Sequence, residues 1–211
     1  MDLKNYAIYL DMDGVLADFD EGIRRLGFKP DPLFNQSSHA MDDEANLWKQ
    51  GMYDVIKGTT FFETLPFMPG AVDLYKAVAE AEPIILTASP KFGASEDDYL
   101  TAPFFQGAAY AKRRWIEETL LAEVFKVPYG MNDRDGYVTP RRRIPDERFI
   151  CTTSSRKQLF MHRKHSDHQI LIDDRTANCN AWIDAGGFAI YHTSAQDTIA
   201  RLAEYVESKA A

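Results

Sequence analysis

The fold is set by one segment near the start of the chain, Tyr6-Ala7-Ile8-Tyr9-Leu10-Asp11-Met12-Asp13-Gly14-Val15-Leu16-Ala17-Asp18. Its first five residues are a short apolar run, which predicts a strand buried on both faces. Two carboxylates one residue apart, Asp11 and Asp13, follow this strand, and Gly14 allows a sharp turn after them. Such carboxylates can bind a divalent cation, and one can act as a nucleophile while the other transfers protons. An ordinary turn rich in Asp and Gly is the alternative interpretation.

Alternating apolar runs and helical patterns continue along the rest of the chain. Further strands are predicted at residues 83–86, 148–151, 169–172 and 187–191. Helices are predicted at residues 70–80, 108–121, 154–162, 176–185 and 195–209. Ser194 and Asp197 form a capping-box pattern at the start of the last helix. The alternation predicts an α/β fold with a mainly parallel sheet.

Two stretches interrupt this alternation. Residues 18–68 are rich in aromatic and acidic side chains, and residues 41–57 within them are compatible with a helix. We therefore expect a small helical cap at 18–68, inserted into a core that is formed by residues 1–17 and 69–211. A second stretch, within 127–146, contains several Gly and Pro residues and predicts an irregular loop or a hairpin.

Composition limits the functions that are open to the chain. Its 211 residues are 45% apolar and 27% charged, as in globular domains. A net charge of -8 argues against non-specific binding to nucleic acids and membrane surfaces, since both are anionic. Cys151 and Cys179 show neither a CxxC pair nor zinc-site spacing, which excludes a disulfide framework and indicates a reducing, cytoplasmic compartment. The sequence contains neither an apolar run of membrane-spanning length nor an N-terminal signal-peptide pattern.

Three further polar signals lie where predicted strands end, the edge at which open α/β sheets bind ligands. Thr87 follows the second strand, where its hydroxyl can hold phosphate oxygens or cap a helix. Lys157 opens the helix after the third strand, where a cation would neutralise a phosphoryl group and its attacker; a surface lysine is the alternative. Asp173 and Asp174 end the fourth strand, and buried carboxylates are costly unless they are paired or bound to metal. An ion pair with Arg175 is the alternative there.

In this order, these four signals resemble the haloacid dehalogenase superfamily of phosphohydrolases. Longer stretches are similar to one family within it, the 5'(3')-deoxyribonucleotidases. These stretches are Phe61-Phe62-Glu63-Thr64-Leu65-Pro66-Phe67-Met68-Pro69-Gly70-Ala71, Thr87-Ala88-Ser89-Pro90, Ala111-Lys112-Arg113-Arg114-Trp115-Ile116-Glu117, Phe149-Ile150-Cys151-Thr152-Thr153-Ser154-Ser155-Arg156-Lys157 and Leu171-Ile172-Asp173-Asp174-Arg175. The likeness covers most of the chain outside the cap. Loops at about 91–106 and 127–146 depart from the family pattern and leave the substrate open.

The resemblance implies a Rossmann-like core and a definite reaction. Asp11 would attack phosphorus in line and form an aspartyl-phosphate. Asp13 would protonate the leaving alkoxide and then take a proton from the hydrolytic water, so its pKa should be raised. Thr87 and Lys157 would hold phosphate oxygens.

The resemblance also implies Mg²⁺ as the cofactor, because an all-oxygen shell suits this hard cation. Its expected ligands are Asp11, Asp13 through its backbone carbonyl, Asp173 and Asp174. Which member of the acidic pair is the main ligand stays open. Ser89 is expected at the substrate, and Phe19 matches a phenylalanine of the family that stacks on the base. Packing of Phe19 between cap and sheet is the alternative; Trp48, Phe61 and Phe62 are weaker candidates for stacking.

The predicted function is a Mg²⁺-dependent phosphomonoesterase for nucleoside monophosphates, above all deoxyribonucleotides. Two alternatives stay open: a phosphatase for polynucleotide ends or small metabolites, and a metal-dependent nucleotide-binding protein without turnover. The base, the sugar and the position of the phosphate are not predicted, and an aromatic surface on the cap is compatible with a homodimer. Lys164 is a weaker candidate for the role of Lys157. The histidines at 162, 165 and 168 and the arginines at 141–143 are interpreted as solvated side chains.

Overall fold

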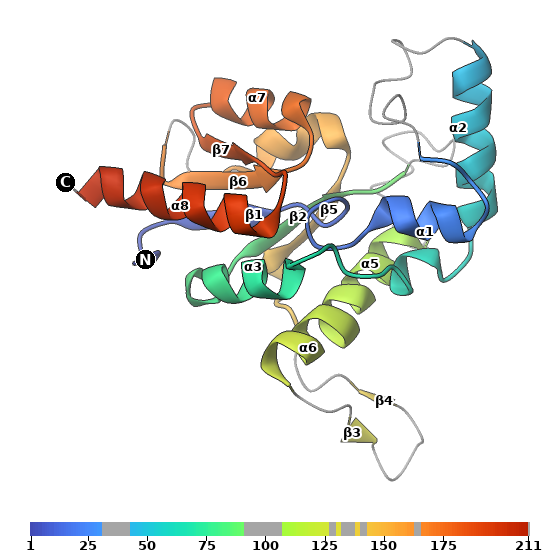
Figure 1. Cartoon of the computed structure of the whole chain (residues 1–211), viewed down its shortest axis with the longest axis horizontal. Helices are drawn as coiled ribbons and strands as arrows, with labels where there is room; N and C mark the ends of the chain where they lie inside the picture. Colours follow the sequence, from blue (N-terminus) through green and yellow to red (C-terminus); the bar gives the residue numbers. More distant parts are fainter. Residues whose placement is uncertain are drawn as a thin grey trace.

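The computed structural model describes residues 1–30, 43–90, 107–126, 130–131, 138–139, 143–162 and 166–210. Five strands form a sheet in the order β5-β2-β1-β6-β7, and all neighbouring pairs are parallel (Figure 1). The strands are β1 (Ala7–Leu10), β2 (Ile84–Ala88), β5 (Phe149–Thr152), β6 (Gln169–Asp173) and β7 (Phe188–Tyr191). The predicted α/β fold and its five strands are confirmed.

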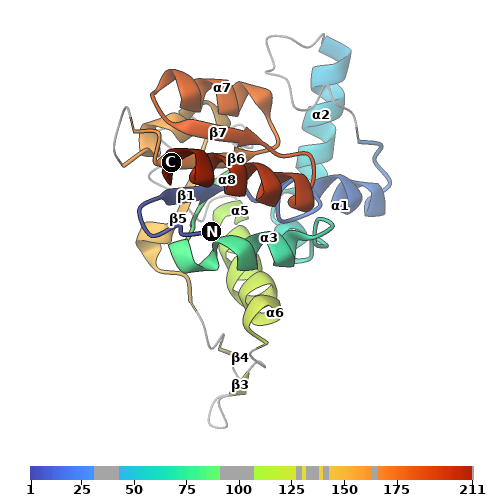
Figure 2. The same cartoon turned by 60° about the vertical axis from the view of Figure 1, so that its left-hand side comes forward.

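Helices cover both faces of this sheet (Figures 1 and 2). One face carries α3 (Ala71–Val78), α5 (Ala108–Arg114), α6 (Leu121–Phe125) and α8 (Ala195–Ala210). The other face carries η7 (Ser154–Phe160) and α7 (Thr176–Asp184). Alternate strand residues enter opposite cores: Ile8 and Leu10 pack toward the first set, and Tyr9 packs against Trp182 on the other face. The short η4 (Ala79–Ala81) and η6 (Asp146–Arg148) precede β2 and β5.

The chain between β1 and α3 contains α1 (Phe19–Arg25), α2 (Asp43–Ile56) and η3 (Phe61–Glu63). In both views α2 stands at the margin of the molecule, away from the sheet (Figures 1 and 2). The predicted helix in this segment is therefore confirmed, while the division of the chain into core and cap domains stays a prediction. Within 127–146, β3 (Gly130–Met131) and β4 (Val138–Thr139) pair antiparallel, as expected for a hairpin.

Two predicted helices differ from the structure in type. The helix predicted at 154–162 is the 3₁₀ helix η7. The helix predicted at 108–121 is divided by a π-helical turn, η5 (Trp115–Leu120), between α5 and α6. Tertiary contacts fix this turn, because the Trp115 ring donates to the Leu65 carbonyl and the Glu117 carboxylate accepts from the Ile144 amide. The described helices include none that is both long and apolar enough to span a membrane.

Candidate active site

The central strands β1 and β6 bring Asp11 and Asp173 side by side at their carboxyl ends. The Asp11 amide donates to the Ile172 carbonyl at 2.9 Å, which extends the pairing of the two strands to this edge. Both carboxylates are buried, Asp11 at 5% exposure and Asp173 fully. Carboxylates buried this deeply require cationic partners.

Lys157 supplies one such partner. Its ammonium group lies 2.8 Å from Asp11 Oδ2 and 2.6 Å from Asp173 Oδ2. Burial alone would lower the pKa of this lysine, but the two carboxylates outweigh it and raise the pKa above its ordinary value. Lys157 therefore places a positive charge between the two acids. Its contact with a phosphoryl group stays a prediction.

The two members of the acidic pair have different surroundings. Asp173 accepts hydrogen bonds from the Asn178 side chain at 2.9 and 3.0 Å and from the Arg175 amide at 2.9 Å, in addition to its contact with Lys157. Within the described ranges, no hydrogen bond reaches the Asp174 side chain. Asp174 thus keeps its carboxylate oxygens available to a ligand, whereas those of Asp173 are already bonded.

Oxygen atoms of Asp11, Asp173 and Asp174 lie within 4.8 Å of one another. Burial, followed by the charges of Asp11 and Asp173, raises the pKa of Asp174 to about 8. A divalent cation would relieve this repulsion, and three carboxylates offer the hard oxygen donors that Mg²⁺ prefers. The residues present therefore fit the predicted cation. Among the described residues, no second group of three or more acidic, histidine or cysteine side chains is placed to hold a metal ion.

Gly14 allows Asp174 to approach the loop that follows β1. A Cβ atom at this position would lie 2.2 Å from Asp174 Oδ2, and the backbone φ of +78° is one that L side chains rarely adopt. The glycine predicted for a sharp turn has a second role here, since only a residue without a side chain leaves room for the carboxylate.

Lys112, on α5, is a second buried cation of the site. Its ammonium group lies 2.5 Å from Asp13 Oδ2, 3.1 Å from Thr87 Oγ1 and 2.5 Å from the Ala88 carbonyl. Thr87 therefore meets a lysine rather than capping a helix. Lys112 was assigned no role from the sequence, although it lies in the apolar stripe that its helix forms with Ala108 and Trp115, where a charge is unexpected.

Asp13 has one bonded and one unbonded oxygen. Lys112 holds Oδ2, whereas Oδ1 is buried and has no hydrogen-bond partner among the described residues. Burial raises the pKa of Asp13, the Lys112 charge opposes this effect, and the Asp11 charge adds to it; the net direction is upward. A carboxyl group with a raised pKa and a free oxygen is suited to proton transfer.

The predicted stacking residue, Phe19, packs against other aromatic residues of the 18–68 segment. Its ring centroid lies 5.5 Å from that of Phe61, 6.2 Å from that of Phe62 and 6.5 Å from that of Tyr53. These partners all belong to residues 18–68, whereas the sequence analysis left packing between cap and sheet as the alternative; stacking of Phe19 on a base stays a prediction. The cluster still borders the site, because the Lys112 ammonium lies 4.8 Å from the centre of the Phe62 ring.

The remaining candidates make no hydrogen bond or ion pair with Asp11, Asp13 or Lys157 among the described residues, or lie outside those residues. Ser89 is buried; its amide donates to Thr152 and its hydroxyl donates to the Pro90 carbonyl at 3.4 Å. His162 and His168 are exposed and pack against different tyrosines, Tyr9 and Tyr6. Candidates outside the described residues are Lys164, His165, Arg141 and Arg142.

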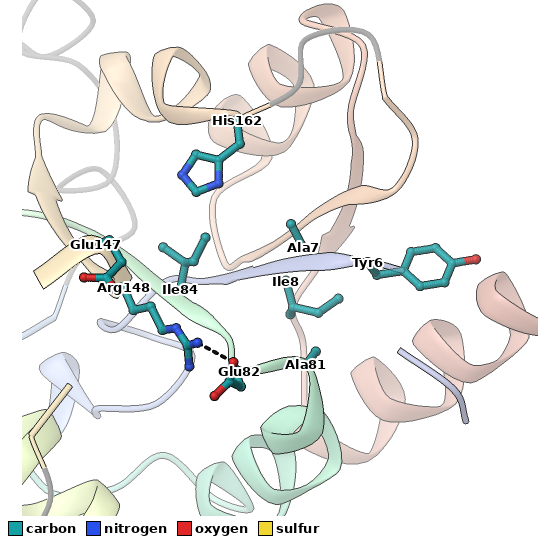
Figure 3. Close-up of a pocket in the computed structure, with 9 residues that line it drawn as sticks. All are labelled: Tyr6, Ala7, Ile8, Ala81, Glu82, Ile84, Glu147, Arg148 and His162. Carbon is teal, nitrogen blue, oxygen red and sulfur yellow. Dashed lines mark hydrogen bonds and ion pairs between the residues drawn. The ribbon is translucent and has the colours of Figure 1, made fainter. Parts of the chain in front are cut away.

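A pocket of about 200 Å³ lies at the opposite, amino-terminal edge of the sheet (Figure 3). Its lining residues are Tyr6, Ala7, Ile8, Ala81, Glu82, Ile84, Glu147, Arg148 and His162. The Arg148 guanidinium is paired with Glu82 and flanked by Glu147, so its charge is compensated. This pocket contains none of the predicted catalytic residues.

Comparisons with known proteins add little evidence on function to that from the geometry of the site. No protein-family model matches the chain, and no curated protein does. A HAD family hydrolase from Deinococcus radiodurans R1, with bound phosphate and sodium, is similar at 15% identity and a TM-score of 0.41, over 89% of this chain and 80% of that one. A hydrolase from Streptococcus pneumoniae TIGR4 is similar at 16% identity and a TM-score of 0.34, over 96% and 99%. At such low values the likeness assigns no activity, so function is inferred from the site itself.

Proposed function

We propose that the chain is a Mg²⁺-dependent phosphomonoesterase of the haloacid dehalogenase type, acting on nucleoside monophosphates through an aspartyl-phosphate. One observation supports this most strongly: the buried Lys157 ammonium contacts both Asp11 and Asp173, beside the unbonded carboxylate of Asp174. Carboxylates and a cation in this arrangement are suited to binding a phosphate group, whose phosphorus atom one of the carboxylates can attack.

Asp11 is the proposed nucleophile. Its Oδ2 contacts Lys157, and its Oδ1 accepts from the Met12 amide at 2.7 Å, so the carboxylate has a fixed orientation. One oxygen forms a bond to phosphorus while the ester bond to the leaving alkoxide breaks. Lys157 balances the charge that the phosphoryl oxygens bring to the site.

Asp13 is the proposed acid and base. Its unbonded Oδ1 would donate a proton to the leaving alkoxide, and a raised pKa favours the protonated form that this step needs. The resulting carboxylate would accept a proton from the water that hydrolyses the aspartyl-phosphate. Lys112 holds the other oxygen and orients the group throughout.

Asp11 and Asp174 are the residues that would hold the cation, together with the Asp13 carbonyl implied by the resemblance. When bound, Mg²⁺ would neutralise negative charge on the phosphate and polarise it toward attack. Asp173 orients this centre through Lys157 and Asn178. Thr87 and Lys112 are the residues that would contact the other phosphate oxygens.

The proposal of a nucleotide substrate rests on the sequence resemblance and on the aromatic cluster of Phe19, Tyr53, Phe61 and Phe62. This cluster borders the Asp13 side of the site through the contact between Phe62 and Lys112. The leaving alkoxide must lie near Asp13, so the organic part of the substrate would extend toward these rings. Both cysteines are free thiols, which is compatible with the proposed cytoplasmic location.

Phosphate release from a substrate panel with Mg²⁺ present tests this function. Nucleoside monophosphates should exceed sugar phosphates and end-phosphorylated oligonucleotides in kcat/KM, and excess EDTA should abolish the activity. Preference for an oligonucleotide would favour the polynucleotide-end alternative. Tight, Mg²⁺-dependent nucleotide binding without phosphate release would instead identify a binding protein and refute the proposed turnover.

A further inference from the structure

Lys49 lies on the inward face of α2. At about 100° per residue, it falls within an arc of roughly 100° that runs from Met52 through Ile56 to Tyr53. Met52 and Ile56 are buried, at 0% and 2% exposure, and Lys49 and Tyr53 are half-buried. Lysine is uncommon on the inward face of a surface helix, because removing its charge from water is costly. Its position therefore indicates that the Lys49 charge has a role toward the part of the molecule that α2 faces.

Tyr53 shows that this face is turned toward the candidate active site. Its ring belongs to the aromatic cluster that borders Lys112, with 6.5 Å between its centroid and that of Phe19. Burial, followed by the charge of Asp13, raises the pKa of Tyr53 to about 12, while the charge of Arg175 opposes this effect. The Tyr53 hydroxyl is therefore a protonated donor that lies near both Asp13 and Arg175.

Arg175 is a second cation at this place, and it directly follows Asp174 in the chain. Its amide donates to Asp173 Oδ1 at 2.9 Å and its guanidinium donates to Ser154 Oγ at 3.0 Å, so the residue is anchored beside the carboxylates. Burial lowers the pKa of Lys49, and the charge of Arg175 lowers it further. Two cations from distant segments of the chain are thus close enough to repel each other.

We propose that Lys49 and Arg175 bind a second anionic group of the substrate, and that the preferred substrate is a nucleoside bisphosphate. An anion between the two cations would replace their repulsion by attraction, and both ammonium and guanidinium groups form strong, charge-assisted hydrogen bonds with phosphate. The Tyr53 hydroxyl would donate a further hydrogen bond. This inference rests on the proposed function, since the first phosphate is the one that Asp11 attacks.

The place of this second-anion site agrees with the proposed reaction. The leaving alkoxide must lie near Asp13, and the charges of Asp13 and Arg175 both shift the pKa of Tyr53, so the site lies on the leaving-group side. The second phosphate would therefore belong to the leaving group, as in a nucleoside 3',5'-bisphosphate. Water cleaves one phosphate ester bond, and the products are inorganic phosphate and a nucleoside monophosphate that keeps the second phosphate.

Kinetics with a nucleoside 3',5'-bisphosphate and the 5'- and 3'-monophosphates of the same nucleoside test this inference. With Mg²⁺ present, the wild-type protein should give a kcat/KM for the bisphosphate at least about tenfold above that for either monophosphate. Lys49→Met should remove most of this preference, whereas Lys49→Arg, which keeps the charge, should retain it. Lys57→Met, at an exposed lysine just beyond the end of α2, is the matched control and should also retain it.

Calorimetric titration separates the second-anion site from the proposed turnover. Asp11→Asn lacks the proposed nucleophile, so its affinity for each nucleotide can be measured without hydrolysis. The bisphosphate should bind about tenfold more tightly than the monophosphates, and the additional substitution Lys49→Met should abolish this difference.

The outcomes distinguish the two proposals. Hydrolysis of the monophosphates with no preference for the bisphosphate in either measurement would overturn the second-anion site and leave the proposed function standing. A preference that survives Lys49→Met would also overturn the site. A higher kcat/KM for a 5'-phosphorylated dinucleotide would overturn the proposed substrate, because the second anion there is a phosphodiester. If no nucleotide is hydrolysed, the proposed function is refuted, and the titration alone decides whether the second-anion site exists.

Discussion

At the scale of single residues, the site depends on how closely Asp174 approaches Gly14. The carboxylate occupies the space that any side chain at residue 14 would fill. This contact places the Asp174 oxygens beside Asp11, where the negative charges of the two carboxylates repel each other unless a cation is bound. The glycine therefore contributes to the proposed metal site without providing a ligand.

Gly14→Ala should weaken Mg²⁺ binding at least tenfold, because the new methyl group would displace Asp174. It should also cost about 1–2 kcal/mol of stability through its left-handed backbone. Gly27→Ala is the matched control, since Gly27 has a φ of +86° but open space around it. Calorimetric Mg²⁺ titration should show a loss of affinity in Gly14→Ala only. Equal Mg²⁺ affinity in the two variants would show that the contact with Asp174 has no such role.

Proton uptake by Asp174 links stability to pH. The unfolded chain releases this proton near pKa 3.8 and the folded chain near 8, so the folded state binds more protons between these values. The free energy of unfolding of the metal-free protein should therefore fall as pH rises through this window. Bound Mg²⁺ favours the ionised carboxylate, so its stabilising effect should be larger near pH 8 than near pH 5. Thermal unfolding with Mg²⁺ or EDTA measures this; equal shifts at both pH values would contradict it.

Lys112 holds Asp13 and lowers its pKa against the effect of burial. Lys112→Met should reduce kcat/KM by about 10²–10³, because it removes a charge from both Asp13 and the phosphate. The free enzyme needs protonated Asp13, so kcat/KM falls as pH rises through its pKa. That alkaline limb should shift to higher pH in the variant. Lys4→Met, at an exposed lysine, is the control, and an unchanged pH profile in Lys112→Met would exclude the assigned role.

Sequence patterns located the site residues that follow strands, because the ends of parallel strands meet at one edge. Asp11, Lys157 and Asp174 were predicted from this rule, and the structure brings them together. Lys112 was missed although a lysine in the apolar stripe of its helix is an unusual local signal. That signal indicates a buried charge but does not identify its partners, Asp13 and Thr87, which are distant in the sequence. Phe19 was assigned its role from the resemblance, and no local pattern contains the packing against Phe61 that orients its ring.

At the scale of elements, the helix that carries Lys112 is anchored by its π-helical turn. Trp115 in this turn is fully buried, and its indole donates to the Leu65 carbonyl at 2.7 Å, near the end of the 18–68 segment. The repeating apolar pattern of this segment predicts one continuous helix. It contains no information on the distant Leu65 carbonyl with which the Trp115 side chain forms a hydrogen bond. The 3₁₀ type of η7 was likewise not predicted, although its position and its lysine were.

Trp115→Phe should lower the free energy of unfolding by about 1–3 kcal/mol, because the buried Leu65 carbonyl loses its donor. Phenylalanine keeps most of the contact with Phe67, whose ring centroid lies 5.3 Å from that of Trp115. Urea denaturation measures the change. The control variant Phe67→Leu removes the ring contact and leaves the hydrogen bond, so it separates the contributions of the two interactions to stability. If Trp115→Phe is as stable as the wild-type protein, the hydrogen bond to the Leu65 carbonyl does not stabilise the fold.

At the scale of the whole molecule, the two edges of the sheet differ in the charged residues that they contain. The carboxyl edge concentrates the buried acids and two buried lysines, whereas the pocket at the amino edge contains a compensated arginine (Figure 3). The net charge of -8 argues against non-specific binding to polyanions, yet it is compatible with a phosphomonoester at this edge. There the lysines, and a cation when bound, make the local charge favourable.

The central claim is that Asp11 carries the phosphoryl group. Tandem mass spectrometry of protein that is acid-quenched during turnover of a nucleoside monophosphate with Mg²⁺ tests it most directly. We predict phosphate on Asp11 in the wild-type protein, with neither this adduct nor turnover in Asp11→Asn, while Asp18→Asn, which alters the cap of α1, stays active. Phosphate on another residue, or undiminished turnover in Asp11→Asn, would contradict the mechanism.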